Sequence, residues 1–333
     1  MDFSDVTRLL KDDLLKVEDA IRENYQSDIP LIPGISGYLM DAGGKRVRPI
    51  LLLLVSRLLN RTIDAKVIKH GCVIEYIHAA TLLHDDVVDD TTVRRGHETV
   101  NSKWGSDASI LVGDFLLSRG MLILAEDCDA KIIRAVSQAT RILVEGGILE
   151  FTEARNLDIS EEHCLEVIRG KTASILSVSC ELGALLANAD QETQDTITAF
   201  GTDFGMAFQL MDDAMDYDAE EDTLGKPPGM DLKEGQVTLP LLHLYQHGNR
   251  ALKKELESFV KNPHLTHKEF DYVLERMREM KSIDYTLDRA RQYIEKGKSH
   301  LKTMDFPCPE YIEALEAVAD HTIERHLAAR ACS

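Results

Sequence analysis

Apolar residues return every three to four positions along most of this 333-residue chain, which is the period of a helix with one buried face. Strand patterns are nearly absent. The predicted helices span residues 5–24, 65–90, 108–127, 131–157, 160–188, 191–217, 239–247, 267–280, 283–304 and 309–330. One connection, 218–238, is long, polar and rich in glycine and proline, as functional or disordered loops usually are. The pattern predicts an all-α fold, a single large helical bundle around a central cavity or core.

Composition narrows the class of protein further. A hydrophobic fraction of 44% suffices for a large core, and no linker divides the chain, so we expect one domain over residues 1–333. The formal net charge of −19 argues against nucleic acid as a partner. No uninterrupted apolar run approaches about 18 residues, and the N-terminal stretch lacks a signal-peptide pattern. We therefore expect no transmembrane segment and a cytoplasmic protein.

Two strongly apolar helices end in aspartate clusters of the same spacing. The first cluster is Asp85, Asp86, Asp89 and Asp90 in AATLLHDDVVDD, and the second is Asp212, Asp213 and Asp216 in FQLMDDAMDYD. Like charges four residues apart on a helix repel each other, so the clusters need compensation. Paired carboxylates are typical ligands of Mg²⁺, which also takes oxygens from substrate phosphates. Zinc is disfavoured because no His or Cys lies at ligand spacing.

Basic residues that suit a phosphate ligand recur near the same helices. They are Lys45, Arg46 and Arg48 in GGKRVRP, Arg94 and Arg95 in RRG, Lys171 in GKTAS and Lys226 in LGKPPG. Each type is also common at solvated helix starts. The GKT stretch lacks the upstream glycine and the preceding strand of a Walker motif, so we do not interpret it as one.

Taken in order, the motifs GGKRxRP, DDxxD, RRG, KT, FQxxDDxxD and GKxxGxD resemble those of the trans-isoprenyl diphosphate synthases, from about residue 35 to 245. The stretch IEYIHAATLLHDDVVDD resembles most the polyprenyl branch, of the octaprenyl diphosphate synthase type. The resemblance implies an isoprenoid synthase fold around an elongation cavity. It also implies head-to-tail, trans condensation of isopentenyl diphosphate with an allylic diphosphate.

The resemblance further implies roles for individual residues around the allylic diphosphate. Three Mg²⁺ ions would bridge that diphosphate to Asp85, Asp89 and Asp212. The remaining aspartates Asp86, Asp213 and Asp216 would reach the metals through water or through neighbouring ligands. Charge on the departing diphosphate would be stabilised by Arg94, Lys171 and Lys226, and the carbocation would be lined by Thr172 and Gln209. The two aspartate clusters would then face each other across the cavity mouth.

The second substrate would have its own site. By the same resemblance, isopentenyl diphosphate would be held by Lys45, Arg48, His78 and Arg95. A homodimer is also implied, and the apolar stretch 108–126 offers a face for it. Two departures weaken the family pattern: Gly147 and Glu150 stand where it has Glu and Gln, and Gln236 stands where it often has Lys.

The resemblance also implies that the residues one turn before Asp85 influence product length. Ala80 and Thr81 stand where short-product relatives carry a bulky aromatic, so the growing chain can extend past them. At about 5.4 Å per helical turn, we expect a product of roughly C30 to C50, near C40. The alternatives are a shorter farnesyl or geranylgeranyl product, a class I terpene cyclase, or a non-catalytic synthase subunit. The GGKRVRP motif and the second DDxxD disfavour the cyclase, and the complete aspartate clusters disfavour the inactive subunit.

Overall fold

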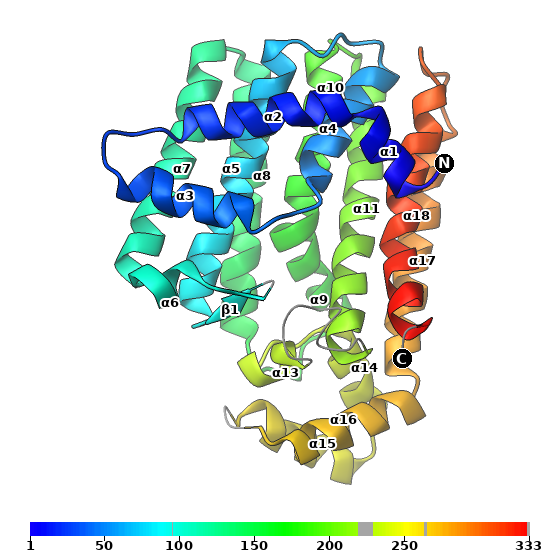
Figure 1. Ribbon diagram of the computed structural model, residues 1–333. Helices are drawn as coiled ribbons and strands as arrows, with labels where there is room; N and C mark the ends of the chain where they lie inside the picture. The colour runs from blue at the N-terminus through cyan, green and yellow to red at the C-terminus, as the bar shows by residue number, and fades with distance from the viewer. Residues whose placement is uncertain (95, 219–228, 263–264, 332–333) are drawn as a thin grey trace. The chain divides into compact units, whose positions relative to one another are not determined.

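The computed structural model describes residues 1–94, 96–218, 229–262 and 265–331. Helices account for almost all of the regular structure in this part of the chain, which confirms the all-α prediction (Figure 1). The elements are α1 (Phe3–Leu9), α2 (Lys11–Asn24), α3 (Leu31–Asp41), α4 (Val47–Leu58), α5 (Ala65–Val88), β1 (Val93–Arg94), β2 (His97–Glu98), α6 (Val100–Trp104), α7 (Ser106–Asp127), α8 (Ala130–Glu153), α9 (Glu161–Ile168), the π-helix η1 (Arg169–Ala173), α10 (Ser174–Leu186), α11 (Gln191–Asp218), α13 (Met230–Glu234), α14 (Leu239–His247), α15 (Arg250–Val260), α16 (His267–Glu279), α17 (Ser282–Leu301) and α18 (Glu310–Ala331).

The chain divides into two compact units. Unit 1 comprises residues 1–140, 175–201 and 298–318, and unit 2 comprises 141–174, 202–297 and 319–333. The division falls inside α8, α10, α11, α17 and α18, so it does not follow a linker. A single domain over the whole chain therefore stays a prediction.

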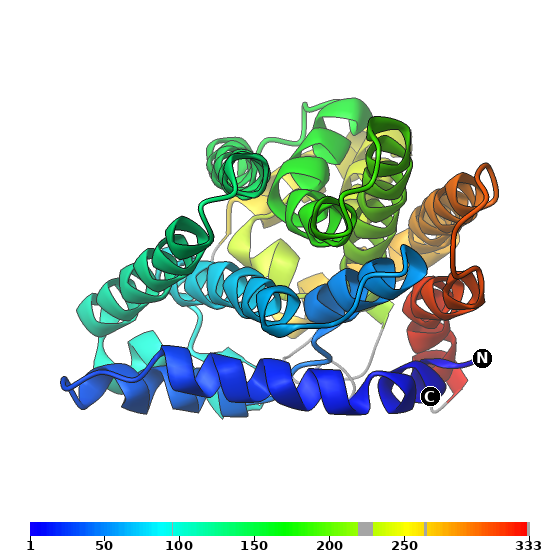
Figure 2. The same ribbon diagram turned by 90° about the horizontal axis from the view of Figure 1, so that it is seen from above.

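The core of unit 1 is built on α4 and α5. Residues 51–55 of α4 are fully buried, and α2 packs against both helices, as Figure 2 shows. Helix α7 packs closely on α5 because its glycines leave room: a Cβ at Gly113 would lie 2.4 Å from Nε2 of His84. Ser109 of α7 donates a hydrogen bond of 2.8 Å to the carbonyl of Leu83. These contacts fix the half of α5 that ends in the first aspartate cluster.

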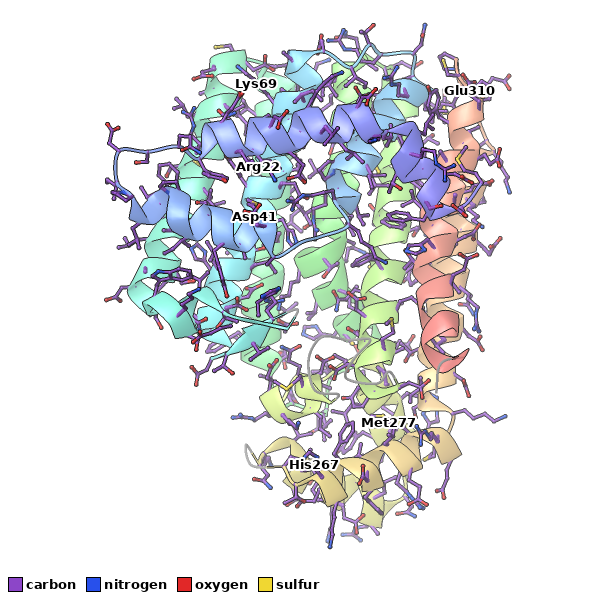
Figure 3. All side chains as sticks on the ribbon, in the orientation of Figure 1. Arg22, Asp41, Lys69, His267, Met277 and Glu310 are labelled. Carbon is purple, nitrogen blue, oxygen red and sulfur yellow. The ribbon has the colours of Figure 1, made fainter. Side chains whose placement is uncertain are left out.

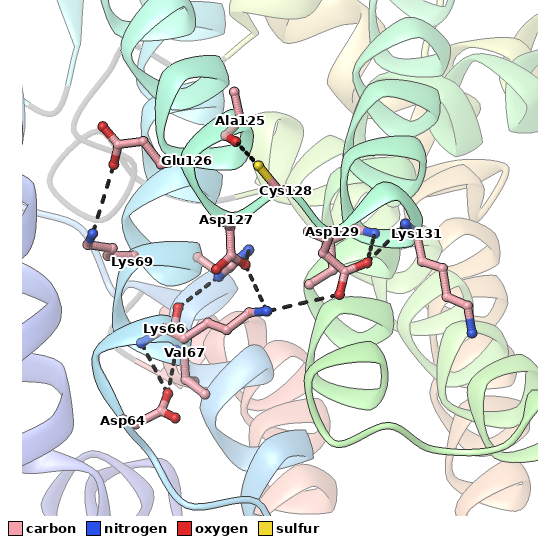
Figure 4. Close-up of polar contacts among 12 residues, drawn as sticks. Asp64, Lys66, Val67, Lys69, Ala125, Glu126, Asp127, Cys128, Asp129 and Lys131 are labelled. Carbon is pink, nitrogen blue, oxygen red and sulfur yellow. Dashed lines mark hydrogen bonds and ion pairs between the residues drawn. The ribbon is translucent and has the colours of Figure 1, made fainter.

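Polar contacts secure the edges of unit 1. Arg22 of α2 lies 3.5 Å from Asp41 of α3 (Figure 3). At the start of α5, Lys66 lies 3.0 Å from Asp127, the last residue of α7, and Nε2 of the buried His70 lies 3.4 Å from the same carboxylate (Figure 4). Ion pairs thus hold the N-terminal end of α5 against α7, and side-chain packing holds its C-terminal end.

In unit 2, α16 packs against α14 and against the end of α11 through apolar side chains. Met277, labelled in Figure 3, is fully buried on α16, and Tyr217 of α11 stacks on Phe270 with 6.4 Å between ring centroids. Gly205 of α11 meets η1 directly, since a Cβ there would lie 2.5 Å from Cα of Ala173. The close approach positions the residues of η1 against those of α11.

Several elements differ from the predicted ones. The helix expected over 5–24 breaks at Leu10, and the one expected over 160–188 contains the π-helix. The prediction missed α3, α4, α6, α13, α15 and the short hairpin of β1 and β2. Helix α4 is buried on nearly all sides, so its sequence has no polar face to produce a period. The long connection 218–238 contains α13, and its residues 219–228 lie outside the described part.

Among the described residues, one helix is long and apolar enough to cross a membrane, namely α7. Length and composition alone single it out, and a core helix of a soluble protein passes the same test. Because α7 packs on α5 along the Gly113 side, packing accounts for part of its apolar content.

Candidate active site

The first aspartate cluster lies where α5 ends. Asp85 and Asp89 are half-buried and share one turn, since the amide of Asp89 donates a hydrogen bond of 2.8 Å to the carbonyl of Asp85. Asp90 is exposed and adopts a left-handed backbone with φ of 52°. The chain therefore turns away after Asp89, and Asp85 and Asp89 remain as a carboxylate pair on one side of the helix end.

Asp86 has a different environment. It is 2% exposed, and Nε and Nη2 of Arg94 both lie 2.8 Å from its carboxylate. Burial raises the pKa of Asp86, and the Arg94 guanidinium opposes that shift. Asn101 donates to the Asp86 carbonyl at 2.8 Å. Asp86 thus fastens the β1–β2 hairpin to α5, and Arg94, 35% exposed, remains accessible beside it.

The GGKRVRP loop separates its three cations. Arg46 adopts a left-handed backbone with φ of 50° before α4, and its guanidinium lies 2.5 Å from Glu18 and 3.0 Å from Glu75. Because Arg46 is sheltered among carboxylates, it is a structural cation. Lys45 is exposed in the loop, and Arg48 is half-buried in the first turn of α4. Arg95 lies outside the described residues.

The residues predicted to control product length lie one turn inside α5. Ala80 is fully buried, and the half-buried Thr81 donates a hydrogen bond of 2.8 Å to the carbonyl of His78. Tyr76, a further turn back, is buried, and its hydroxyl donates to the Ile21 carbonyl at 2.6 Å. This bond directs Tyr76 toward α2. The role of Ala80 and Thr81 in chain length stays a prediction.

In unit 2, glycines bring α8 and η1 into backbone contact. A Cβ at Gly146 would lie 2.4 Å from the amide nitrogen of Lys171, and one at Gly170 would lie 2.9 Å from Cα of Gly146. Such approach is possible only without side chains at both positions. Single π-turns inside α-helices are frequent at functional sites, and this one carries Lys171 and Thr172.

The close crossing places Lys171 against Glu150, with which it forms an ion pair. Beside it runs a chain of hydrogen bonds: Thr172 donates to Oε1 of Gln209 at 2.7 Å, and Nε2 of Gln209 donates to Asp213 at 2.7 Å. The sequence-based prediction named Lys171, Thr172 and Gln209, and the structure brings them together. It missed the contact with Glu150, which was noted only as a departure from the family pattern. The sequence signal for this contact was the Gly146–Gly147 pair one turn before Glu150, because glycines on a helix allow another backbone to approach closely.

The second aspartate cluster ends α11. Asp212 is half-buried, whereas Asp213 is 2% and Asp216 1% exposed. Burial raises the pKa of Asp213 to about 7, and the nearby carboxylates, Asp212 first, push in the same direction. Asp216 accepts a hydrogen bond of 3.1 Å from the amide of Asp231, which ties α11 to α13. Lys226, the remaining predicted cation, lies outside the described residues.

A pocket opens within unit 2 beside these groups. Its lining combines an apolar part from α9 with a polar part that includes Lys171, Thr172, Gln209 and Asp213. Glu150 and Gln236 also line it. Both are positions at which the chain departs from the family pattern.

The carboxylates suit a hard divalent cation. Within the described ranges, no group of three or more Asp, Glu, His or Cys residues could hold a metal ion. Pairs of carboxylates such as Asp85 and Asp89 instead match the needs of Mg²⁺, which keeps several waters and completes its shell with substrate phosphates. Asp85 and Asp89 belong to unit 1, and Asp212 belongs to unit 2. That all three bind the same metal cluster stays a prediction.

Comparison with known proteins gives one consistent answer. The family model of polyprenyl synthetases matches residues 29–277. The chain is 35% identical to octaprenyl diphosphate synthase of Haemophilus influenzae over 330 residues, covering 98% of each. It is 32% identical to heptaprenyl diphosphate synthase component 2 of Bacillus subtilis, covering 98% of this chain and 91% of that one. A crystal structure of polyprenyl synthase from Caulobacter crescentus complexed with calcium and isoprenyl diphosphate aligns with a TM-score of 0.93 and 35% identity over 98% of each chain.

Proposed function

This chain belongs to the polyprenyl synthetase family and is a trans-prenyltransferase, and on that premise we propose that it makes a long-chain polyprenyl diphosphate near C40 with Mg²⁺ as its metal. The observation that carries the proposal is the pair of aspartate clusters at the ends of α5 and α11, together with the Lys171–Thr172–Gln209 group. The Caulobacter relative supports a divalent metal, because its crystal structure is of a complex with calcium and isoprenyl diphosphate.

The chemistry begins with loss of diphosphate from the allylic substrate. Mg²⁺, held by Asp85, Asp89 and Asp212, would supply Lewis-acid stabilisation of the charge on the departing diphosphate. Lys171 offers a fixed ammonium for the same charge, and such preorganised groups act most strongly where water is scarce. We assign stabilisation of the allylic carbocation to the side-chain oxygens of Thr172 and Gln209, which a mutual hydrogen bond of 2.7 Å holds in place.

The acceptor, isopentenyl diphosphate, needs a separate cationic site. Lys45, Arg48 and His78 belong to unit 1, and we assign them to its diphosphate together with Arg95. Arg94 is held by Asp86, and we assign its accessible side to the allylic diphosphate. Asp86 also keeps the hairpin that carries Arg94 in place.

Product length near C40 is supported by the small residues Ala80 and Thr81 and by the similarity to octaprenyl diphosphate synthase of Haemophilus influenzae. We further propose that the enzyme acts as a homodimer in the cytoplasm. The exposed apolar side chains of α7 support the dimer, among them Leu111 and Met121, which are 67% and 63% exposed.

Three variants test the metal assignment. Asp85→Asn and Asp212→Asn should each reduce turnover by several orders of magnitude without unfolding the protein, because each removes a metal-binding charge. Asp90→Asn is the matched control: Asp90 is exposed and left-handed, a conformation that Asn tolerates, so its turnover should stay near wild type. Full turnover of Asp85→Asn, or turnover in excess chelator, would contradict the proposal.

A further inference from the structure

The Lys171 ammonium already has an anionic partner inside the cavity of unit 2. Its ion pair with Glu150 is sheltered, since the two side chains are only 24% and 25% exposed. Shelter from water strengthens such a pair relative to one at the surface. An arriving diphosphate therefore meets a lysine whose charge is partly neutralised by the protein itself.

Close contact between the backbones of α8 and η1 determines where Glu150 lies relative to Lys171. Gly146 stands one turn before Glu150 on α8, and Gly170 stands directly before Lys171 on η1. These two glycines are the points where the helix backbones touch. On the other side, η1 rests on α11 through Gly205 and Ala173. The packed helices therefore hold the backbones of Glu150 and Lys171 at a fixed separation within reach of an ion pair.

We propose that Glu150 is a positioning residue for Lys171 and an internal competitor of the allylic diphosphate. Its carboxylate holds the ammonium in the cavity before substrate arrives, and it opposes the second anion once the diphosphate is there. The carboxylate thus lowers affinity for the allylic diphosphate, both as substrate and as the elongated product. This inference rests on the proposed function for its substrate class.

Glu150→Gln separates the two effects, because the amide oxygen still accepts a hydrogen bond from Lys171 whereas the charge is gone. We expect the apparent KM for farnesyl diphosphate to fall about three- to tenfold, the range of a partly sheltered ion pair. The KM for isopentenyl diphosphate should stay unchanged. Glu150→Ala removes the acceptor as well, so Lys171 loses its positioning and kcat should fall below that of Glu150→Gln.

Glu153→Gln is the matched control. Glu153 lines the same cavity and carries the same charge, but it accepts from Asn156 at 2.6 Å and lies 3.6 Å from His163. If contact with Lys171 matters, this variant keeps the wild-type KM for the allylic substrate. An equal fall in both glutamate variants would mean that general charge, and not Glu150, sets the affinity, and would overturn the proposal.

A binding readout makes the test independent of turnover. Titration calorimetry of inorganic pyrophosphate with Mg²⁺ should show tighter binding to Glu150→Gln than to wild type and to Glu153→Gln. Unchanged or weaker binding by Glu150→Gln would overturn the inference, as would identical kinetics of the Gln and Ala variants at position 150. If wild type binds pyrophosphate but forms no prenyl product from any allylic starter, the proposed function fails, and the calorimetry still decides the role of Glu150.

Discussion

Adding one methyl group at Gly146 should disturb both the stability and the active site of unit 2. In Gly146→Ala the new Cβ would lie 2.4 Å from the Lys171 nitrogen and 2.6 Å from the Gly170 carbonyl carbon, both of which are backbone atoms. Ordinary contact begins at 3.4 Å, so α8 and η1 must separate by about 1 Å. Overpacking of this kind costs about 1–3 kcal/mol, which corresponds to a fall in Tm of roughly 2–12 °C for a domain of this size.

The same separation should lower activity, because a displacement of about 1 Å can reduce catalysis by roughly a hundredfold. We expect kcat/KM for the allylic substrate to fall by about ten- to a hundredfold, measured on protein whose circular dichroism shows it to be folded. Thermal unfolding and steady-state kinetics with varied allylic diphosphate are the two assays.

The neighbouring glycine supplies the control. A Cβ at Gly147 meets nothing within 4 Å, so Gly147→Ala makes the same chemical change without the clash. Since Ala is a better helix former than Gly by about 1 kcal/mol, Gly147→Ala should be as stable as wild type or more stable. If Gly146→Ala matches Gly147→Ala in Tm and in kcat/KM, the account of the α8–η1 crossing is wrong.

Three further outcomes follow from unit 1. Ala80→Phe should shorten the main product to about C15–C20 by filling one turn of α5, and unchanged product length on chromatography would contradict the cavity assignment. Burial lowers the pKa of His70 below 6.5 in the folded protein. As pH falls through 6.5, the histidine of the unfolded chain therefore binds a proton before that of the folded protein does. The free energy of unfolding should decrease below pH 6.5 for this reason. Denaturant midpoints at high and low pH should therefore differ more in wild type than in His70→Gln, and equal differences would exclude this linkage. If the proposed homodimer uses this face of α7, sedimentation velocity should show a dimer for wild type and a monomer for the double variant Leu111→Glu, Met121→Glu, whereas a dimer that persists in this variant would contradict the proposed interface.

Much of the fold was predictable because amphipathic helices carry their period in the sequence. Helices α5, α7 and α11 appear within two residues of their predicted bounds. The prediction failed at α4, where residues 51–55 are all buried and no polar face interrupts the apolar run. It also missed α15, although Leu252, Leu256 and Val260 form a buried stripe at helical spacing.

Contacts among the residues of the predicted site could be derived from the sequence only in part. The spacing of the aspartates identified the ends of α5 and α11, and the structure joins Lys171, Thr172, Gln209 and Asp213 in one unit. The pairing of Lys171 with Glu150 could not be derived from sequence, because it depends on backbone contact between Gly146 and Gly170, two segments more than twenty residues apart. Long-range contact of this kind leaves no periodic signal along the chain.

The most direct test of the central claim is product analysis of the purified enzyme. Labelled isopentenyl diphosphate is incubated with each short allylic diphosphate and Mg²⁺, and the chain lengths of the products are determined. We expect successive all-trans condensations that end near C40, require Mg²⁺ and disappear in Asp85→Asn. Termination at C15 or C20 would contradict the long-chain assignment, and absence of condensation with every allylic starter would contradict the function itself.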